Sequence, residues 1–398
     1  MLGIQSNRLL GLANKQVVVS VALIVNALIW YASVLRFVQA NEPNICVLVI
    51  HFSGLIISAF FGASIAKRIE RSHLLIFWMF LGTASSFFLF GLTVNSLLVS
   101  SLVSLFLGVS LGIGMPAAMS YFTDCTDVEK RGRISGIGLL LTGIGIFVFN
   151  IAIDVMIIDY LLWGGLLLAW RLSSLLLFLS VKSFRTIERK KSFGSYKDIL
   201  RQQSFLLYFI PWITFSFINY LTGTTNDADI VVNTTLIFSF FMAIFAFVGG
   251  FFLDSFGRKR VTIIGFVMLG FSSAIRGLSS EAIILYFSAM IDGIAWGFIL
   301  VIFIWVLWSD LSHNSASDKY YALGVSPYFA SMFLNIVIGQ YIRDNFVDTS
   351  VFSFTAFFLF LAVLPLVYAP ETLPEKNLKE RELKKYLDNA QKIKEKYF

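Results

Sequence analysis

The chain has 398 residues, of which 57% are hydrophobic, 16% aromatic and only 14% charged, and its mean hydropathy is +0.80. Soluble domains carry about 25% charged residues, so this composition excludes a water-soluble protein and places most of the chain in lipid. The formal net charge of +7 reflects membrane topology rather than a nucleic-acid partner, because of where the basic residues fall.

Long apolar runs recur along the whole chain. A helix needs about 20 apolar residues to cross a hydrocarbon core about 30 Å thick, and it satisfies its own main-chain hydrogen bonds. The first run has no small-residue cleavage pattern, so we expect it to stay in the protein as a spanning helix. The sequence therefore predicts an all-α membrane protein with twelve transmembrane helices, at residues 17–37, 45–66, 74–93, 96–120, 134–153, 160–181, 204–222, 230–253, 261–279, 282–308, 321–342 and 351–369.

The basic residues are distributed asymmetrically between the two sides of these spans. With both chain ends placed in the cytoplasm, 27 of the 31 lysines and arginines fall in the tails and the cytoplasmic connections. The exceptions are Arg36, Arg276 and Arg343 near the outer face and Arg171 within the sixth span. This is the positive-inside pattern. It predicts a multi-pass protein of the plasma membrane with cytoplasmic N- and C-termini, and it gives no support for a nucleic-acid partner.

The longest central connection is basic and polar and divides the spans into six plus six. Landmarks recur between the two sets at a nearly constant spacing: Gly62 and Gly250 are 188 residues apart, Gly108 and Gly293 are 185 apart, and Asp124 and Asp310 are 186 apart. Parallel six-helix repeats around a midplane cavity are a transporter architecture. We therefore divide the chain into an N-tail (1–16), an N-terminal bundle (17–181), a linker (182–203), a C-terminal bundle (204–369) and a basic tail (370–398).

One connection carries a recognisable motif. The run Gly250-x-x-x-Asp254-x-x-Gly257-Arg258-Lys259 resembles the cytoplasmic signature between helices eight and nine of the major facilitator superfamily. The stretches 116–138, after the fourth span, and APETLPE at 369–375, after the twelfth, are also similar to that family. The resemblance implies two pseudo-symmetric six-helix bundles, alternating access and a monomer. In the first-half copy, Ala66 stands at the position of Asp254 and Ile69 replaces the second glycine.

Each residue of the motif has a physical use. Gly257 tolerates the positive φ of a tight turn. We expect Asp254 to face the N-terminus of helix eleven near Tyr321, where a carboxylate is attracted by the helix dipole, and Arg258 to bridge Asp254 and Asp310. The resemblance implies that this cluster controls gating without touching substrate. The alternative is that the basic residues only fix topology and the acid only solvates the turn.

In the first half, Arg68 or Arg71 paired with Asp124 would keep a partial version of this cluster. Without an acid at position 66, the attraction between a charge and a helix end is missing there. We therefore expect helix five to be held at its cytoplasmic end mainly by packing.

Ionisable groups at membrane depth are costly and often functional. Asp292, about ten residues into the tenth span, is the first candidate for a substrate cation or a coupling proton, since the resemblance implies that helices one, four, seven and ten line the cavity. Burial raises the pKa of such a carboxylate and would let it exchange a proton. The alternative is that Asp292 pairs with a buried base or lies nearer the outer surface.

The other candidates for substrate contact are less specific. Arg171 follows Trp170, and we interpret this pair as the interfacial start of helix six. Asn26 and Trp30 are four residues apart and share one helical face, and Trp296 and Asn219 lie on spans ten and seven; such residues are more often packing than ligands. His51, in the outer third of span two, is interpreted as a packed polar group rather than a proton relay.

These observations predict a secondary transporter, or permease, for a small organic solute. No GxxxxGK[ST] motif is present, so ATP does not drive it directly, and no cofactor or metal is expected. The aromatic spans favour export of a hydrophobic compound, which could be coupled to protons. The alternative is a facilitative uniporter, such as a sugar or metabolite permease, and the sequence does not decide between the two. Alternatives of other classes are a non-transporting sensor and a polytopic membrane enzyme. The three scattered histidines and the absence of metal-ligand spacing count against an enzyme.

Overall fold

The computed structural model describes residues 15–41, 44–89, 96–155, 160–180, 194–219, 228–279, 281–312, 315–346 and 348–374. The N-tail up to residue 14, the linker from 181 to 193 and the C-terminal tail from 375 lie outside these ranges. The first half comprises α2 (Lys15–Asn41), α3 (Ile45–Ile65), α4 (Arg71–Phe87), α5 (Leu97–Gly112), α6 (Met115–Cys125), α7 (Arg131–Val155) and α8 (Tyr160–Ser180).

The second half follows a short linker helix, α9 (Tyr196–Leu200). Its helices are α10 (Gln203–Asn219), α11 (Ala228–Phe256), α12 (Arg258–Leu278), α13 (Ala282–Leu300), the π-helical turn η2 (Val301–Val306), α14 (Leu307–Ser312), α15 (Asp318–Asn345), α16 (Asp348–Leu361) and α17 (Val363–Tyr368).

Each of the twelve predicted spans coincides with one helix or with consecutive helices separated by a turn. Ten stretches of the described chain are long and apolar enough to cross a membrane. The helices α4 and α10 have 17 residues each, about the lower limit for crossing a bilayer. The prediction of an all-helical membrane protein is confirmed.

Three spans are interrupted, the twelfth only by a single residue between α16 and α17. The fourth breaks between α5 and α6, where Pro116 lies in the first turn of α6, a position at which the missing N–H of proline costs no hydrogen bond. The tenth passes from α13 through η2 into α14. A π-helical turn shifts the register of the helix that follows it, so η2 sets the direction in which Asp310 of α14 points.

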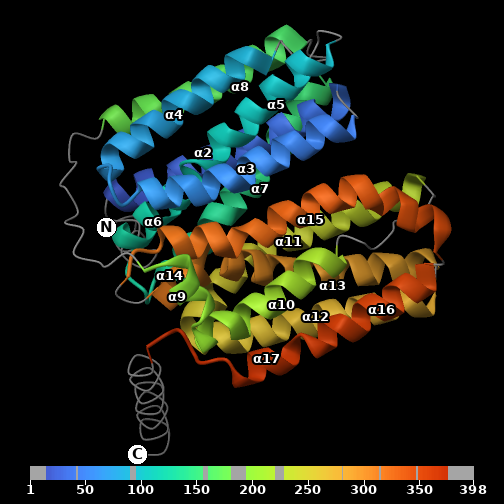
Figure 1. Cartoon of the computed structure of the whole chain (residues 1–398). Helices are drawn as coiled ribbons and strands as arrows, with labels where there is room; N and C mark the ends of the chain where they lie inside the picture. The colour runs from blue at the N-terminus through green and yellow to red at the C-terminus, as the bar shows by residue number, and fades with distance from the viewer. Residues whose placement is uncertain are drawn as a thin grey trace, which may run out of the picture.

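The two halves lie side by side with their helices roughly parallel (Figure 1). They meet mainly where α7 packs on α11 and where α3 packs on α15. The α7–α11 crossing is very close: a Cβ on Gly132 would lie 2.6 Å from the carbonyl oxygen of Gly250, and a Cβ on Gly250 would lie 2.4 Å from that of Gly132. Only glycine fits at both positions, so the halves contact each other through their backbones.

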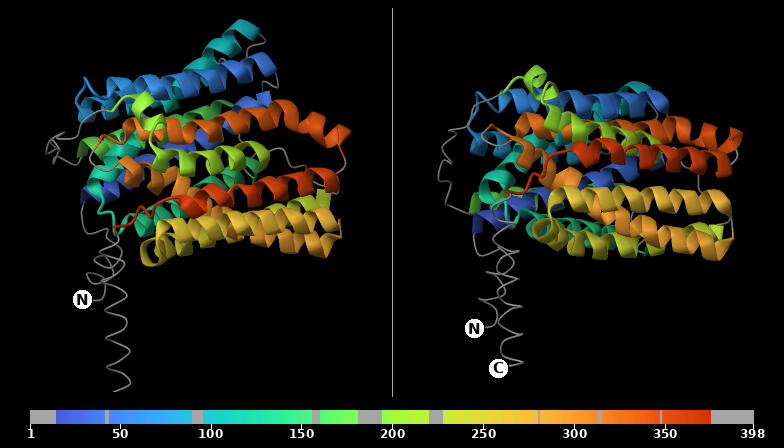
Figure 2. Two further views of the ribbon diagram at one scale, coloured as in Figure 1. Left: turned by 60° about the horizontal axis from the view of Figure 1, so that its bottom comes forward. Right: turned by 90° about the horizontal axis from the view of Figure 1, so that it is seen from below.

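The connections α3–α4, α6–α7, α11–α12 and α14–α15, with the linker helix α9, gather at one end of the molecule, where α2 begins and α17 ends (Figures 1 and 2). We call this the basic end, because most of the lysines and arginines of the connections lie there. The other end is called the distal end. The motif residues all lie at the basic end.

Candidate functional site

The turn between α11 and α12 is built around Gly257. Its φ is 98°, a conformation that glycine adopts without strain. The carboxylate of Glu371 accepts hydrogen bonds from the main-chain N–H groups of Arg258 at 2.8 Å and Lys259 at 3.2 Å, so it caps α12. Lys259 donates from Nζ to the carbonyl of Val367 at 2.6 Å. Glu371 belongs to the APETLPE stretch, and its capping role was not predicted from the sequence.

Asp254 reaches across to the other half of the molecule. Its Oδ1 accepts from the N–H of Gly132 and its Oδ2 from the N–H of Arg133, both at 2.9 Å, in the first turn of α7. The sequence predicted that Asp254 faces the start of helix eleven, which is α15 in the structure. This prediction is wrong, because α11, which carries Asp254, packs on α7. The prediction that helix five, which is α7, is held at its cytoplasmic end mainly by packing is wrong for the same reason. Anions are stabilised at helix N-termini, so Asp254 fixes this end of α7.

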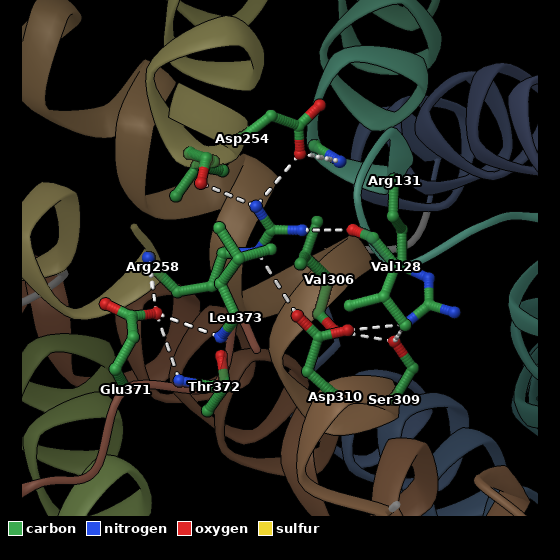
Figure 3. A network of polar contacts seen from close by, with 12 residues as sticks. Val128, Arg131, Asp254, Arg258, Val306, Ser309, Asp310, Glu371, Thr372 and Leu373 are labelled. Atoms are coloured by element: carbon green, nitrogen blue, oxygen red, sulfur yellow. Dashed lines mark hydrogen bonds and ion pairs between the residues drawn. The ribbon is translucent and has the colours of Figure 1, made fainter. Parts of the chain in front are cut away.

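Arg258 forms the bridge that the sequence predicted. Its Nη1 donates to Asp254 Oδ1 at 2.9 Å and its Nε to Asp310 Oδ2 at 3.2 Å. Its Nη2 donates to the carbonyl of Val128, in the first half, at 2.6 Å. Figure 3 shows the guanidinium between these partners. The side chain is fully buried, so every polar partner counts.

A second arginine completes this network from the first half. Arg131, the first residue of α7, forms an ion pair with Asp310 and donates from Nη1 to the hydroxyl of Ser309 at 3.1 Å. Its Nη2 donates to the carbonyl of Thr123 at 3.1 Å. Asp310 is thus shared by one arginine from each half (Figure 3). Arg131 was not singled out in the sequence, because one base in the run KRGR resembles the others.

The first-half copy forms a separate network around Arg71. This residue pairs with Asp124, as predicted, and with Asp318 of α15, with Nη2 3.3 Å from Oδ2. Ser120 donates to the same Oδ2 at 3.0 Å, and Ser317 donates to the hydroxyl of Ser120 at 2.9 Å. Asp318 is fully buried and lies in the first turn of α15. The sequence did not identify it.

The linker helix α9 also joins the halves at this end. The Tyr196 hydroxyl donates to the carbonyl of Phe60 in α3 at 2.8 Å. Lys319 of α15 donates to the carbonyl of Gly194 at 2.9 Å, and its ammonium lies 5.0 Å from the centre of the Tyr196 ring. Burial raises the pKa of the Tyr196 phenol, so it remains a hydrogen-bond donor at neutral pH. We call the Asp254, Arg71 and α9 contacts together the latch.

A small cavity lies between the halves, next to the latch. Its volume of about 20 Å³ admits a water but no organic solute, so the halves are closed around it. Apart from the Tyr321 and Ser326 hydroxyls its lining is apolar. The lining residues come from α3, α5, α6 and α15 and are Ile56, Ala59, Leu111, Gly112, Met115, Pro116, Met119, Tyr321, Ala322, Val325, Ser326 and Phe329.

Comparisons with known proteins identify a family for the second half of the chain and a fold for the whole chain. The model of the Major Facilitator Superfamily matches residues 204–395, and no curated protein matches the sequence. The structure of the proton:xylose symporter XylE bound to 6-bromo-6-deoxy-D-glucose is 16% identical, with a TM-score of 0.67 and coverage of 89% of this chain and 96% of that one. A variant of the E. coli fucose:proton symporter FucP is 12% identical, with a TM-score of 0.70 and coverage of 90% and 100%. The human organic anion transporter TETRAN is 12% identical, with a TM-score of 0.64 and coverage of 88% and 99%.

The second half of the chain matches the model of this superfamily, and the whole chain has the fold of the solved members. The prediction of its fold, two six-helix bundles, is confirmed by the structures that it matches along nearly its whole length. It is a multi-pass membrane protein, and the family that its second half matches consists of secondary transporters and not of enzymes.

Asp292 has a basic partner in the structure. Its Oδ2 lies 2.6 Å from Nη2 of Arg276 on α12. Arg276 also donates from Nε to the Ser288 hydroxyl at 2.8 Å and lies over the ring of Phe352, 5.7 Å from its centre. All these groups belong to the second half. The arrangement is the alternative left open by the sequence, a carboxylate paired with a base, here a partly buried one, and a role of Asp292 in coupling stays a prediction.

Arg171, Asn26 and Trp30 lie together in the core of the first half. Arg171 is fully buried and donates from Nη1 to Oδ1 of Asn26 at 3.2 Å. Its guanidinium lies 4.3 Å from the ring centre of Trp78 and 5.5 Å from that of Trp30. The prediction of an interfacial Arg171 is wrong, because α8 already begins at Tyr160. Two tryptophan faces stabilise the cation, while Nε and Nη2 have no hydrogen-bond partner among the described residues.

The remaining candidates lie elsewhere. Trp296 packs against Phe215, with ring centres 4.7 Å apart, and against Phe238 at 6.1 Å. It is part of an aromatic core in the second half and remains a predicted substrate contact. Asn219 ends α10, and its side chain lies outside the described part of the structure.

Proposed function

We propose that this transporter carries a small hydrophobic organic compound across the plasma membrane by alternating access, with the latch holding the basic end closed. The observation that carries the proposal is the polar contact between the halves. Asp254 caps a helix of the other half, and Arg131 and Arg258, one from each half, share Asp310. Such contacts exist only while the halves touch at this end, so they favour one state of a two-state equilibrium.

The orientation follows from the same residues. The basic end holds most of the lysines and arginines of the connections, and such residues are retained on the cytoplasmic side. The basic end and both termini are therefore proposed to be cytoplasmic. The state described here, closed at that end, would then release or receive the solute from the outside when the distal end opens.

The substrate class rests on the cavity between the halves. Methionine and aromatic side chains line it, including Met115, Met119 and Phe329, and methionine adapts to apolar ligands of varied shape. These features favour a hydrophobic compound over a sugar. The solved structures of a xylose and a fucose symporter support coupling to protons at the level of fold only. A sugar or metabolite uniporter is the second candidate.

Transport by purified protein in liposomes tests the proposal. A panel of hydrophobic organic compounds and sugars is measured for counterflow exchange, with and without a pH gradient. We expect exchange of at least one hydrophobic compound, and its accumulation only with the gradient. Accumulation that ignores the gradient would establish a uniporter. A wild-type protein that exchanges nothing on the panel would contradict the proposed substrate class and favour the sensor alternative.

A further inference from the structure

His51 of α3 is fully buried and sits in a defined hydrogen-bond chain. Its Nδ1 lies 2.9 Å from the carbonyl oxygen of Ser104 on α5, and its Nε2 lies 3.3 Å from the hydroxyl of Tyr31 on α2. A carbonyl only accepts, so Nδ1 carries the hydrogen and Nε2 of the neutral ring accepts from Tyr31. The basic lone pair of His51 is therefore held by a single hydroxyl, which can reverse its direction by rotation.

This pair faces the opposite half of the transporter. The Tyr31 ring meets Phe329 of α15 edge-on, with centres 5.9 Å apart and planes at 84°. Phe52, the neighbour of His51, meets Phe333 of α15 at 5.9 Å. Phe329 also lines the cavity between the halves. One side chain thus connects the histidine pair with the space in which a solute would bind.

The surroundings of His51 differ from those of the other buried ionisable groups. Asp292 is paired with Arg276 inside the second half, and Arg171 is enclosed by tryptophans inside the first. Among the residues that the structure describes, the titratable groups that face the pair are Tyr31 itself and, from α15, Tyr328 next to it; α5 presents the Ser104 carbonyl. None of these partners is a charged group, so a proton on His51 would introduce a new charge at the contact between the halves.

We propose that His51, with Tyr31, is the proton-binding site that couples transport to a pH gradient. The inference rests on the proposed function and goes beyond it by assigning the coupling residue. A proton added to Nε2 turns this atom into a donor, and the Tyr31 hydroxyl rotates to accept from it. The proton comes from water and returns to water, so the step needs no other reactant.

Protonation favours opening at the distal end. A cation without a counter-ion is costly in an apolar contact, and the cost falls when the halves separate there and water enters. His51 lies six residues after α3 begins at Ile45, hence toward the distal end. The protonated state therefore favours separation of α3 from α15 at that end, and loss of the proton permits closure. Proton and conformation are then linked reciprocally.

A distance measurement tests this without a known solute. Spin labels are placed on Cys46, which is exposed at the start of α3, and on Tyr341→Cys, an exposed site near the end of α15, with Cys125→Ser. The full chain is studied in lipid nanodiscs from about pH 8 to about pH 5, the range in which histidine titrates. We expect the ratio of long to short distances to rise about tenfold as pH falls, within the usual range of coupling.

His51→Gln should abolish this response, because its amide can make both hydrogen bonds but cannot take up the proton. Tyr31→Phe should move the midpoint and retain the response. The matched control, His73→Gln, removes an exposed histidine near the start of α4 and should respond like wild type. A His51→Gln protein that responds like wild type, a wild type without a response, or a control without one would each overturn the assignment. Melting temperature and gel filtration establish that each variant is folded.

Transport provides a second readout that separates this inference from the proposed function. With a solute found by counterflow, His51→Gln should keep exchange and lose accumulation driven by the pH gradient. Loss of both would indicate a structural role and contradict the assignment. If wild-type protein exchanges no solute, the proposed function fails, and the label distances still decide whether His51 controls opening.

Discussion

The two networks of the latch solve the same problem with opposite charges. In the first half, α7 begins with Arg131, which pairs with Asp310 of the second half. In the second half, α15 begins with Asp318, which pairs with Arg71 of the first. These helix starts are 187 residues apart, the spacing of the internal repeat. Each half thus presents one terminal charge to its opposite in the other half.

This reversal explains the missing acid of the first-half motif. Asp254 of α11, in the second half, caps α7 from across the interface. By the internal repeat, its counterpart Ala66 would face α15, which already carries Asp318 in its first turn. Two carboxylates there would repel each other. The acid of the first-half network is therefore Asp318, which lies on α15 itself rather than at the motif position occupied by Ala66.

The largest effect is expected from Asp310→Asn. The change leaves Arg131 and Arg258 buried with a weakened partner, and breaking a buried ion pair from one side costs about 3–5 kcal/mol. The basic end should therefore open. An Ala322→Cys reporter, buried in the closed cavity, should then react at least 100-fold faster with an impermeant maleimide, in a background without Cys46 and Cys125. An unchanged rate would mean that this network does not hold the end closed.

Asp254→Asn should have a smaller effect in the same direction. The amide oxygen still accepts one hydrogen bond and Arg258 keeps Asp310 as a charged partner, but the attraction between the charge and the start of α7 is lost, a term of up to ~2 kcal/mol. We expect the reporter to react about tenfold faster. Lys259→Gln is the control, since within the described part of the chain its ammonium bonds to Val367 of its own half and the rate should not change. Equal rates for Asp254→Asn and wild type would leave the motif as a topological signal only.

The comparison can be sharpened by exchanging the acids of the first half. Ala66→Asp alone should open the basic end by about 1–2 kcal/mol, because the new carboxylate faces Asp318. Combined with Asp318→Asn it should restore the closed state, so the double-mutant cycle gives a coupling energy of about 1 kcal/mol or more. Reporter kinetics on the four proteins measure it. Additive effects would show that positions 66 and 318 do not interact.

Local sequence patterns predicted the elements but not their partners across the interface. The twelve spans follow from apolar runs bounded by charges, and the Arg258 bridge follows from the motif, which places Arg258 four residues after Asp254 across the turn at Gly257. The contact of Asp254 depends on which helices of the two halves pack together, and no local pattern encodes that. Asp318 and Arg131 were missed for the same reason. The depth of Arg171 was misjudged because its neighbours on α2 and α4 are distant in sequence.

The two halves also differ at one equivalent position, where Arg171 is buried and Phe360 is 41% exposed, and Arg171→Met tests what that difference means. A Cβ on Gly82 of α4 would lie 2.4 Å from Nε of Arg171, and a Cβ on Gly270 of α12 would lie 2.8 Å from the ring of Phe360. The glycines are 188 residues apart and their partners 189, so the repeat places a cation in one half where the other has a phenyl ring.

Replacing a buried charge by an apolar side chain of similar size is often neutral or stabilising. Arg171→Met should therefore leave the melting temperature in detergent unchanged or higher, because Phe360 shows that this helix packing accepts an apolar group. The change frees Asn26 from its bond to the guanidinium, so an effect on counterflow with unchanged stability would make the charge functional. A loss of several degrees, with the matched Phe360→Met protein unaffected, would instead show that the cation and its tryptophans hold the first half together.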